Sequence, residues 1–121
     1  MSKDDYHVIA YKVLLYLYAC LKEKISFDQR VYDKAIRKDQ IGENYLINVY
    51  RMMQEKGLIE GAVFVKAWGN VLILASEEQD LRITVEGIEY LSEHGRMKAV
   101  GKYLQESMDM VTGLIRMVGL V

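Results

Sequence analysis

Three polar side chains lie four and three residues apart in the segment that follows Gly42, the first glycine of the chain. Asn44, Asn48 and Arg51 fall on one face of a helix predicted over residues 43–56. An Asn side chain can hydrogen-bond adenine at two atoms, and an Arg side chain can do the same to guanine. In a helix-turn-helix protein, the second helix of the motif places such side chains in the major groove of DNA. The spacing therefore predicts a base-reading face, and the alternative is an ordinary helix face exposed to solvent.

Basic side chains on the preceding predicted helix, residues 28–38, are suited to neutralising DNA phosphates. They are Arg30, Lys34, Arg37 and Lys38, and Lys66 adds a cation in the predicted hairpin. Residues 28–56 hold six basic and five acidic side chains, a net charge of +1, whereas residues 74–95 hold one basic and six acidic ones, a net charge of -5. The polarity favours DNA binding at the first segment. A charge of +1 is nevertheless small for a surface that must make several phosphate contacts.

No set of residues in the sequence matches a catalytic, metal or cofactor site. His7 and His94 are the only histidines and lie far apart in the sequence, and Cys20, the one cysteine, falls on an apolar helix face. A buried cysteine of this kind packs more often than it reacts. The nine glycines are scattered at predicted turns and helix ends and form no phosphate-binding loop. We therefore expect no enzyme activity, no metal and no cofactor.

The elements that position these residues follow from the apolar periodicity of the chain, which has 121 residues and no proline. Helical spacing predicts helices over residues 4–22, 28–38, 43–56, 84–95 and 96–118. β-Branched and aromatic residues predict strands over 58–66 and 71–74, joined by a turn at Gly69 and Asn70. Residues 25–27 form an edge strand or a plain connection, and residues 81–83 are a further short extended candidate. The predicted fold class is mainly α with a small β-hairpin: a winged helix-turn-helix domain over residues 1–95 and a long C-terminal apolar helix over residues 96–121.

The predicted C-terminal helix carries an apolar stripe with the alternating four- and three-residue spacing of a coiled coil. The stripe runs through Met97, Gly101, Leu104, Met108, Val111, Ile115 and Val118, and a second apolar stripe lies beside it. Two stripes give more apolar surface than one domain face needs. We therefore expect a homodimer in which one stripe packs inward and the other crosses the interface, with Leu104, Met108, Val111, Ile115 and Val118 as the dimerisation residues. Packing of the helix wholly within its own chain, or binding of a helix from another protein, is the alternative.

The apolar segments of the chain match neither an export signal nor a membrane span. Val13–Leu21 has the composition of a signal core, but acidic residues precede it and Lys12 cuts it short. Residues 110–121 are interrupted by Arg116 and are shorter than the roughly 20 apolar residues that cross a bilayer. We expect a cytoplasmic protein that does not bind membranes.

Three segments of the sequence resemble those of a known family. Gly57-Leu58-Ile59-Glu60-Gly61 stands at the turn into the predicted hairpin, Ile83-Thr84-Val85-Glu86-Gly87-Ile88-Glu89-Tyr90-Leu91 opens the fourth helix, and Met97-Lys98-Ala99 follows it. Together they are similar to the YjcQ family, over residues 6–104. The resemblance implies one winged-helix-like unit with a C-terminal helix, in small proteins of Gram-positive bacteria and their phages. It implies no functional residues, because the family has no established biochemical activity.

The predicted fold and the candidate residues together favour DNA binding. We expect a winged-helix transcriptional regulator of a bacterium or phage that binds double-stranded DNA as a homodimer. The alternative is a non-enzymatic protein–protein adaptor with the same fold and no affinity for DNA, which contacts its partner through the C-terminal helix or through the wing. Trp68, next to the predicted hairpin turn, suits a protein contact if it is exposed, and the sequence is equally compatible with its packing back onto the core. A continuous positive surface over the predicted phosphate contacts would favour DNA, and a neutral or negative one would favour the adaptor.

Overall fold

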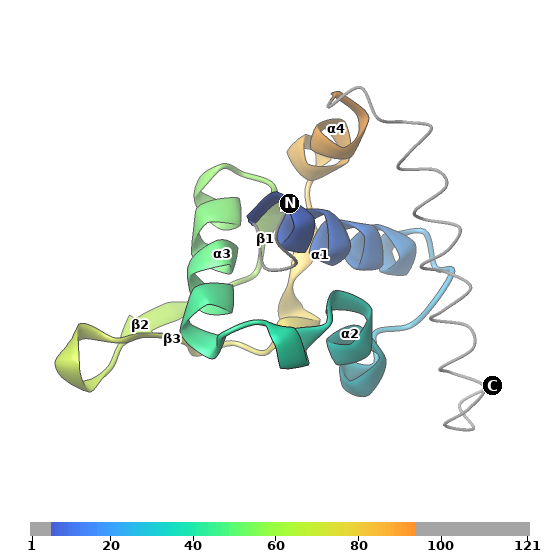
Figure 1. Ribbon diagram of the computed structural model, residues 1–121. Helices are drawn as coiled ribbons and strands as arrows, with labels where there is room; N and C mark the ends of the chain where they lie inside the picture. The colour runs from blue at the N-terminus through green and yellow to red at the C-terminus, as the bar shows by residue number, and fades with distance from the viewer. Residues whose placement is uncertain (1–5, 94–121) are drawn as a thin grey trace.

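The computed structural model describes residues 6–93 as three helices, a β-hairpin region and a fourth helix (Figure 1). The helices are α1 (Tyr6–Leu21), α2 (Gln29–Ile36), α3 (Glu43–Glu55) and α4 (Val85–Glu93), and the strands are β1 (Ile59–Glu60), β2 (Phe64–Lys66), β3 (Leu72–Leu74) and β4 (Arg82–Ile83). Single turns of 3-10 helix lie at η1 (Lys38–Gln40), η2 (Trp68–Asn70) and η3 (Glu78–Asp80). This order confirms the mainly helical fold with a small hairpin, in the winged-helix arrangement. The first turn predicted for α1, the predicted end of α4 at residue 95 and the whole predicted C-terminal helix lie outside the described residues.

Helix α1 lies at the centre of the core. Lys12 is its only Lys, Arg, Asp or Glu, and apolar residues occupy all sides of the helix. A helix that is apolar all round must be covered on several sides to be stable in water. Here α2, α3, α4 and β4 pack against it. Eight of its residues are buried: Ile9, Ala10, Val13, Leu14, Leu15, Tyr16, Leu17 and Ala19.

The single strand predicted over residues 58–66 is wrong, because the chain breaks at Gly61 into β1 and β2. Gly61 has a φ of 94°, and a Cβ at this position would collide with the backbone carbonyl of Asp80. The Gln54 side-chain amide then holds the backbone of Ala62, donating to its carbonyl and accepting from its N–H at 2.9 Å each. Consequently β1 pairs antiparallel with β4, while β2 pairs antiparallel with β3.

The remaining predicted boundaries are close to the observed ones. Residues 25–27 are a plain connection without a strand, and the extended piece predicted at 81–83 is confirmed as β4. Helix α2 ends at Ile36, earlier than predicted, because Arg37 adopts a left-handed conformation with a φ of 57°. The predicted cap of α4 is confirmed, since the Thr84 hydroxyl accepts from the N–H of Gly87 at 3.0 Å and donates to the carbonyl of Gly57 at 2.5 Å.

One nearly buried carboxylate joins the helix-turn-helix to the segment that follows the wing. Glu78, in η3, is 8% exposed. Its Oε1 accepts from Lys38 Nζ at 2.6 Å and from Gln29 Nε2 at 2.8 Å. Its Oε2 accepts from the Tyr50 hydroxyl at 2.5 Å, and that hydroxyl lies 2.6 Å from the hydroxyl of Tyr32. The network therefore connects α2, η1, α3 and η3.

The protonation states of the partners suit this network. Burial raises the pKa of the Tyr50 and Tyr32 hydroxyls, so both remain protonated and able to donate. Burial lowers the pKa of Lys38, but its hydrogen bond and its attraction to Glu78 and Asp33 outweigh burial, and the net pKa is raised. The Lys38 ammonium therefore stays charged beside the carboxylate.

The helices of the described residues do not meet the requirements for crossing a membrane. None of the helices within residues 6–93 combines the length and the apolar composition needed to cross a bilayer.

We expect Glu78→Gln to lower the free energy of unfolding by about 2 kcal/mol, because a charge-assisted acceptor is lost and Lys38 is left without its closest partner. Lys38 is 36% exposed and can regain water, which limits the loss. Urea denaturation followed by circular dichroism measures the change. Glu89→Gln, the same substitution at an exposed position of α4, is the control and should change stability little. Equal stability of the two variants would contradict the role assigned to Glu78.

We expect Gly87→Ala to destabilise the protein by about 2 kcal/mol through overpacking, although alanine is the better helix former. A Cβ at Gly87 would overlap the carbonyl of Leu58 and press on the Ile83 side chain, at 2.7 Å from its Cγ1. Ser92→Ala, at an exposed position of the same helix, is the matched control and should be neutral or slightly stabilising. The same urea denaturation checks both variants, and a stabilised Gly87→Ala protein would contradict the close packing.

Candidate nucleic-acid interface

The α2–η1–α3 segment has the geometry of a helix-turn-helix. Asp28 begins α2 by accepting the N–H of Val31 on its carboxylate at 3.1 Å. The left-handed residue Arg37 ends α2, η1 makes the turn, and Gly42 precedes the first residue of α3 in an extended conformation. Helix α3 then runs beside β3, with the β2–β3 hairpin projecting from the body of the domain (Figure 1).

The three side chains predicted to read bases lie together on the outer face of α3. Asn44 is exposed and Asn48 and Arg51 are partly exposed, on the side opposite the buried face of Leu46, Val49, Tyr50 and Met53. Asn48 Nδ2 donates to the carbonyl of Asn44 at 2.9 Å, and Arg51 Nε donates to Asn48 Oδ1 at 3.4 Å. The sequence spacing therefore placed these side chains on one surface correctly.

Arg51 also has an acidic neighbour on the same helix. Its NH1 lies 3.0 Å from Glu55 Oε1, in an exposed pair one helical turn apart. Such a pair contributes less than about 1 kcal/mol. The guanidinium can therefore exchange Glu55 for a base edge or a phosphate at small cost.

The predicted phosphate contacts divide into two groups. Arg30, Lys34 and Arg37 are exposed on or next to α2, and none of them has an ion pair with another residue of the described range 6–93. Lys38 differs, because its ammonium lies 2.6 Å from Glu78 and 3.5 Å from Asp33. Lys38 therefore holds the turn in place in this structure, and the exposed cations near α2 are the other three.

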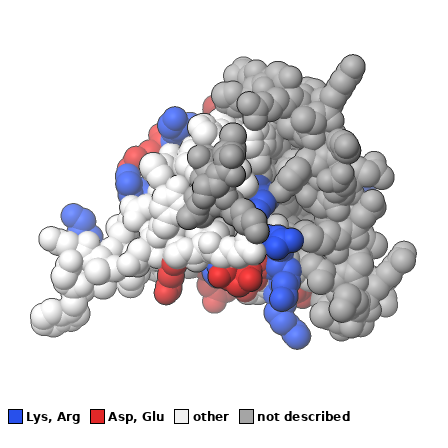
Figure 2. Space-filling model, in the orientation of Figure 1, with Lys and Arg blue, Asp and Glu red and all other residues white. Residues whose placement is uncertain are grey.

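Acidic and basic side chains alternate over the surface seen in Figure 2. Blue groups lie next to red ones on this view, and no continuous blue face appears on it. Glu43 and Glu55 are exposed on α3 itself, and Asp39 is exposed in the turn. The positive potential of the three cations on or next to α2 is therefore local, and the view in Figure 2 lacks the continuous positive surface that would favour DNA over the adaptor.

The wing is an apolar projection with one charge. Lys66 is the only Asp, Glu, Lys or Arg between residues 61 and 76, and the wing is white over most of its surface in Figure 2. Lys66 shares a hairpin face with Phe64, which packs against the core. Trp68, at the tip, is 99% exposed, so it does not pack back onto the core. The other face of the hairpin exposes Val63, Val65, Val71 and Ile73.

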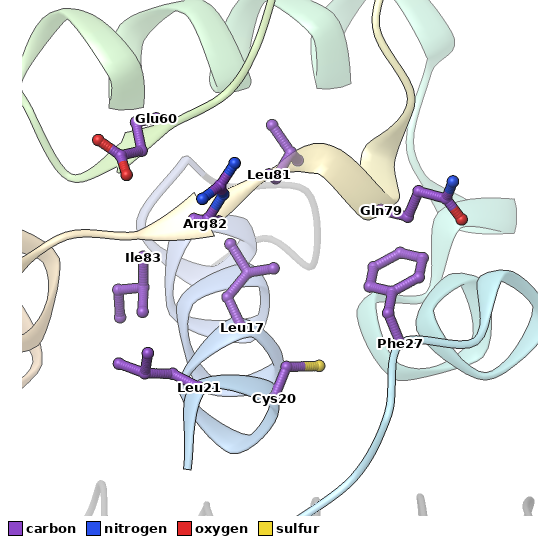
Figure 3. Close-up of a pocket in the computed structure, with 9 residues that line it drawn as sticks. All are labelled: Leu17, Cys20, Leu21, Phe27, Glu60, Gln79, Leu81, Arg82 and Ile83. Carbon is purple, nitrogen blue, oxygen red and sulfur yellow. The ribbon is translucent and has the colours of Figure 1, made fainter. Parts of the chain in front are cut away.

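Within the described residues, the side chains considered for catalysis lie in unrelated surroundings. Cys20 lines an apolar cavity of about 420 Å³ beside α1 (Figure 3), and burial raises the pKa of its thiol to about 11, so it is protonated at neutral pH. His7 Nδ1 lies 2.8 Å from the Tyr90 hydroxyl, and His94 is outside the described residues. Between residues 6 and 93 no three potential metal ligands come together.

Two features of the site did not emerge from the sequence. Glu78 stands in the acidic run of residues 77–80, and nothing in that run distinguishes the one buried carboxylate. The apolar outer face of the wing had a signal, because both faces of the strands are rich in apolar residues, whereas a half-buried hairpin alternates apolar and polar. The absence of this alternation indicates that the hairpin has a second apolar face, which the core does not cover.

The comparisons with known proteins identify a family. The family model described as YjcQ protein matches residues 11–110. No curated protein and no solved structure matches the chain significantly. The match includes the two segments that meet at the junction of Gly57 with Thr84 and covers the helix-turn-helix and the wing. The chain therefore belongs to the YjcQ protein family.

Proposed function

We propose that this protein is a non-enzymatic winged-helix protein that binds double-stranded DNA, with α3 in the major groove, and regulates transcription as a homodimer. The observation that supports the proposal is the grouping of Asn44, Asn48 and Arg51 on the outer face of α3, in a helix-turn-helix that also exposes Arg30, Lys34 and Arg37. A helix-turn-helix places base-reading side chains near the N-terminus of its second helix. Asn44 and Asn48 lie in the N-terminal half of α3, and Arg51 follows about one turn later. Dimerisation would use one of the two apolar stripes predicted for the C-terminal segment, which lies outside the described residues.

The number of free cations limits the electrostatic part of the affinity. Arg30, Lys34 and Arg37 allow about three phosphate contacts per protomer, and each contact lowers the logarithm of affinity by about 0.9 per tenfold increase in salt. Glu43 and Glu55 oppose the approach of DNA. We therefore expect weak binding to mixed-sequence DNA through the phosphate contacts, and specific contacts by the α3 side chains would add the preference for a selected site.

We expect the protein to bind a mixed-sequence duplex at about 50 mM salt and to lose about 40-fold in affinity per protomer at about 200 mM, because phosphate contacts release counterions. Fluorescence anisotropy of a labelled duplex measures both affinities. Absence of binding at the lower salt concentration would overturn the proposal.

Variants identify the surface in the same titration. Arg51→Ala should cost about 1–3 kcal/mol on a selected site and relax the preference at one base position. Lys22→Ala, which removes an exposed cation at the end of α1, is the control for net charge. An equal effect of both substitutions would mean that charge alone, and not the face of α3, determines binding.

A second function is favoured by the exposure of Trp68. An indole that is 99% exposed next to four exposed aliphatic residues is an unusual surface for a monomeric domain and resembles a protein contact site. We propose as the alternative that the wing binds a protein partner and that the protein has no affinity for DNA. The absence of charge on this face suits an apolar partner.

We expect the fluorescence of Trp68, the only tryptophan of the chain, to be quenched by acrylamide as easily as a free tryptophan derivative, because the indole is in water. Adding a wing-binding partner should shift its emission to shorter wavelength, whereas a Trp68→Ala protein should lose the partner and keep its fold. A tryptophan protected from acrylamide in the unbound protein would contradict the exposed wing tip and remove the basis of the adaptor function.

A further inference from the structure

An apolar groove lies along the C-terminal half of α1. Its cavity of about 420 Å³ is walled by α1, the connection that follows it, and the segment from η3 to β4 (Figure 3). An apolar cavity of about 150 Å³ already accommodates a benzene molecule, so this groove has room for several aliphatic side chains. Its apolar lining comes from Leu17, Cys20, Leu21, Phe27, Leu81 and Ile83.

The groove is the uncovered side of a helix that is apolar all round. Elsewhere α1 is covered by α2, α3, α4 and β4. At the groove, Leu21 is 57% exposed and Cys20 is partly exposed. Exposed aliphatic surface at the end of the most apolar helix of the domain indicates that a further segment packs here.

We propose that the C-terminal segment of the same chain occupies this groove with its apolar stripe of Leu104, Met108, Val111 and Ile115. The segment is long enough and has the right chemistry, since residues 94–121 supply two apolar stripes by sequence and one of them suffices to fill this groove. The stripe that remains is then the one available to a second subunit.

The place where the described chain ends favours its own segment over that of another molecule. The described part of α4 extends to Glu93, and Tyr90 packs on α1 with its ring centroid 5.6 Å from that of Tyr11. From Tyr11 to Cys20 along α1 is about 14 Å, at 1.5 Å per residue. Ten residues of chain can span about 33 Å, so the stripe reaches the groove.

Tethering adds a large concentration advantage. A segment joined by a short connection has an effective concentration of about 1 mM at its site, far above the micromolar concentration of a second molecule in solution. The groove is therefore filled within the chain before a second copy competes for it. This inference does not depend on DNA binding.

Cys20, in the wall of the groove and the only cysteine of the chain, is a natural cross-linking probe. Full-length variants Leu104→Cys, Met108→Cys and Val111→Cys are oxidised under mild conditions and separated on non-reducing gels. We expect at least one of them to form an intramolecular disulfide with Cys20, about tenfold faster than the control Glu106→Cys on the opposite face of the predicted helix. The rate should not change when the protein is diluted.

Two results would overturn the proposal. Disulfides that form only between molecules, at rates that fall on dilution, would place the segment of a second copy in the groove. Equal rates for stripe and control positions would show that the stripe does not face α1.

A second measurement uses variants in which Cys20 remains the only cysteine. Ile115→Glu should expose the groove and speed the reaction of Cys20 with a thiol reagent several-fold, whereas Lys102→Glu, off the stripe, should leave it unchanged. Circular dichroism confirms that both proteins are folded. An unchanged rate in Ile115→Glu would also overturn the proposal.

Discussion

The arrangement of the helix-turn-helix depends on one nearly buried carboxylate. Removing Glu78 from water costs several kcal/mol, and the cost is offset only if its oxygens are fully hydrogen-bonded. Lys38, Gln29 and Tyr50 supply these bonds from η1, α2 and α3. Each donor must therefore stay within hydrogen-bond distance of one point, which fixes the position of α3 relative to α2 more strictly than apolar packing alone would.

The same carboxylate couples α3 to the wing. Glu78 belongs to η3, which leads directly into β4, and β4 pairs with β1 at the base of the hairpin region. Gln54 of α3 holds the backbone of Ala62, just before β2. Contacts from α3 therefore hold the chain both before and after the β2–β3 hairpin, which fixes the wing relative to the helix-turn-helix.

The segments shared with the YjcQ family mark a packing junction. The Thr84 hydroxyl donates to the carbonyl of Gly57, and the Thr84 backbone N–H donates to the carbonyl of Leu58. Gly87 has no side chain and so lets α4 approach Leu58 closely. Residues far apart in the sequence are thus kept together by one contact. These contacts explain how the junction is held, and family membership carries no information about what the face of α3 binds.

Local signals in the sequence predicted the helices and the hairpin. The features that the sequence did not reveal depend on contacts between residues far apart in the chain. Apolar periodicity located α3 and its outer face, because helix formation there agrees with burial of one stripe. The break at Gly61 depends on Asp80, and the burial of Glu78 depends on α2 and α3, so neither is visible in its own segment. Trp68 is exposed because no described element covers the wing tip, which is also a property of the whole fold.

The two faces of the wing decide how the two proposed functions relate. Strand alternation places Lys66 on the face that packs against the core and Val65 and Ile73 on the opposite one, where they form a cross-strand pair. A phosphate held by Lys66 would leave the Val65–Ile73 face and the Trp68 tip uncovered. The proposed binding of DNA through α3 and the proposed binding of a protein through the outer wing would therefore use separate surfaces of the domain. A substitution on one surface tests its function without disturbing the other, which is the property that allows the two proposals to be separated in a single protein.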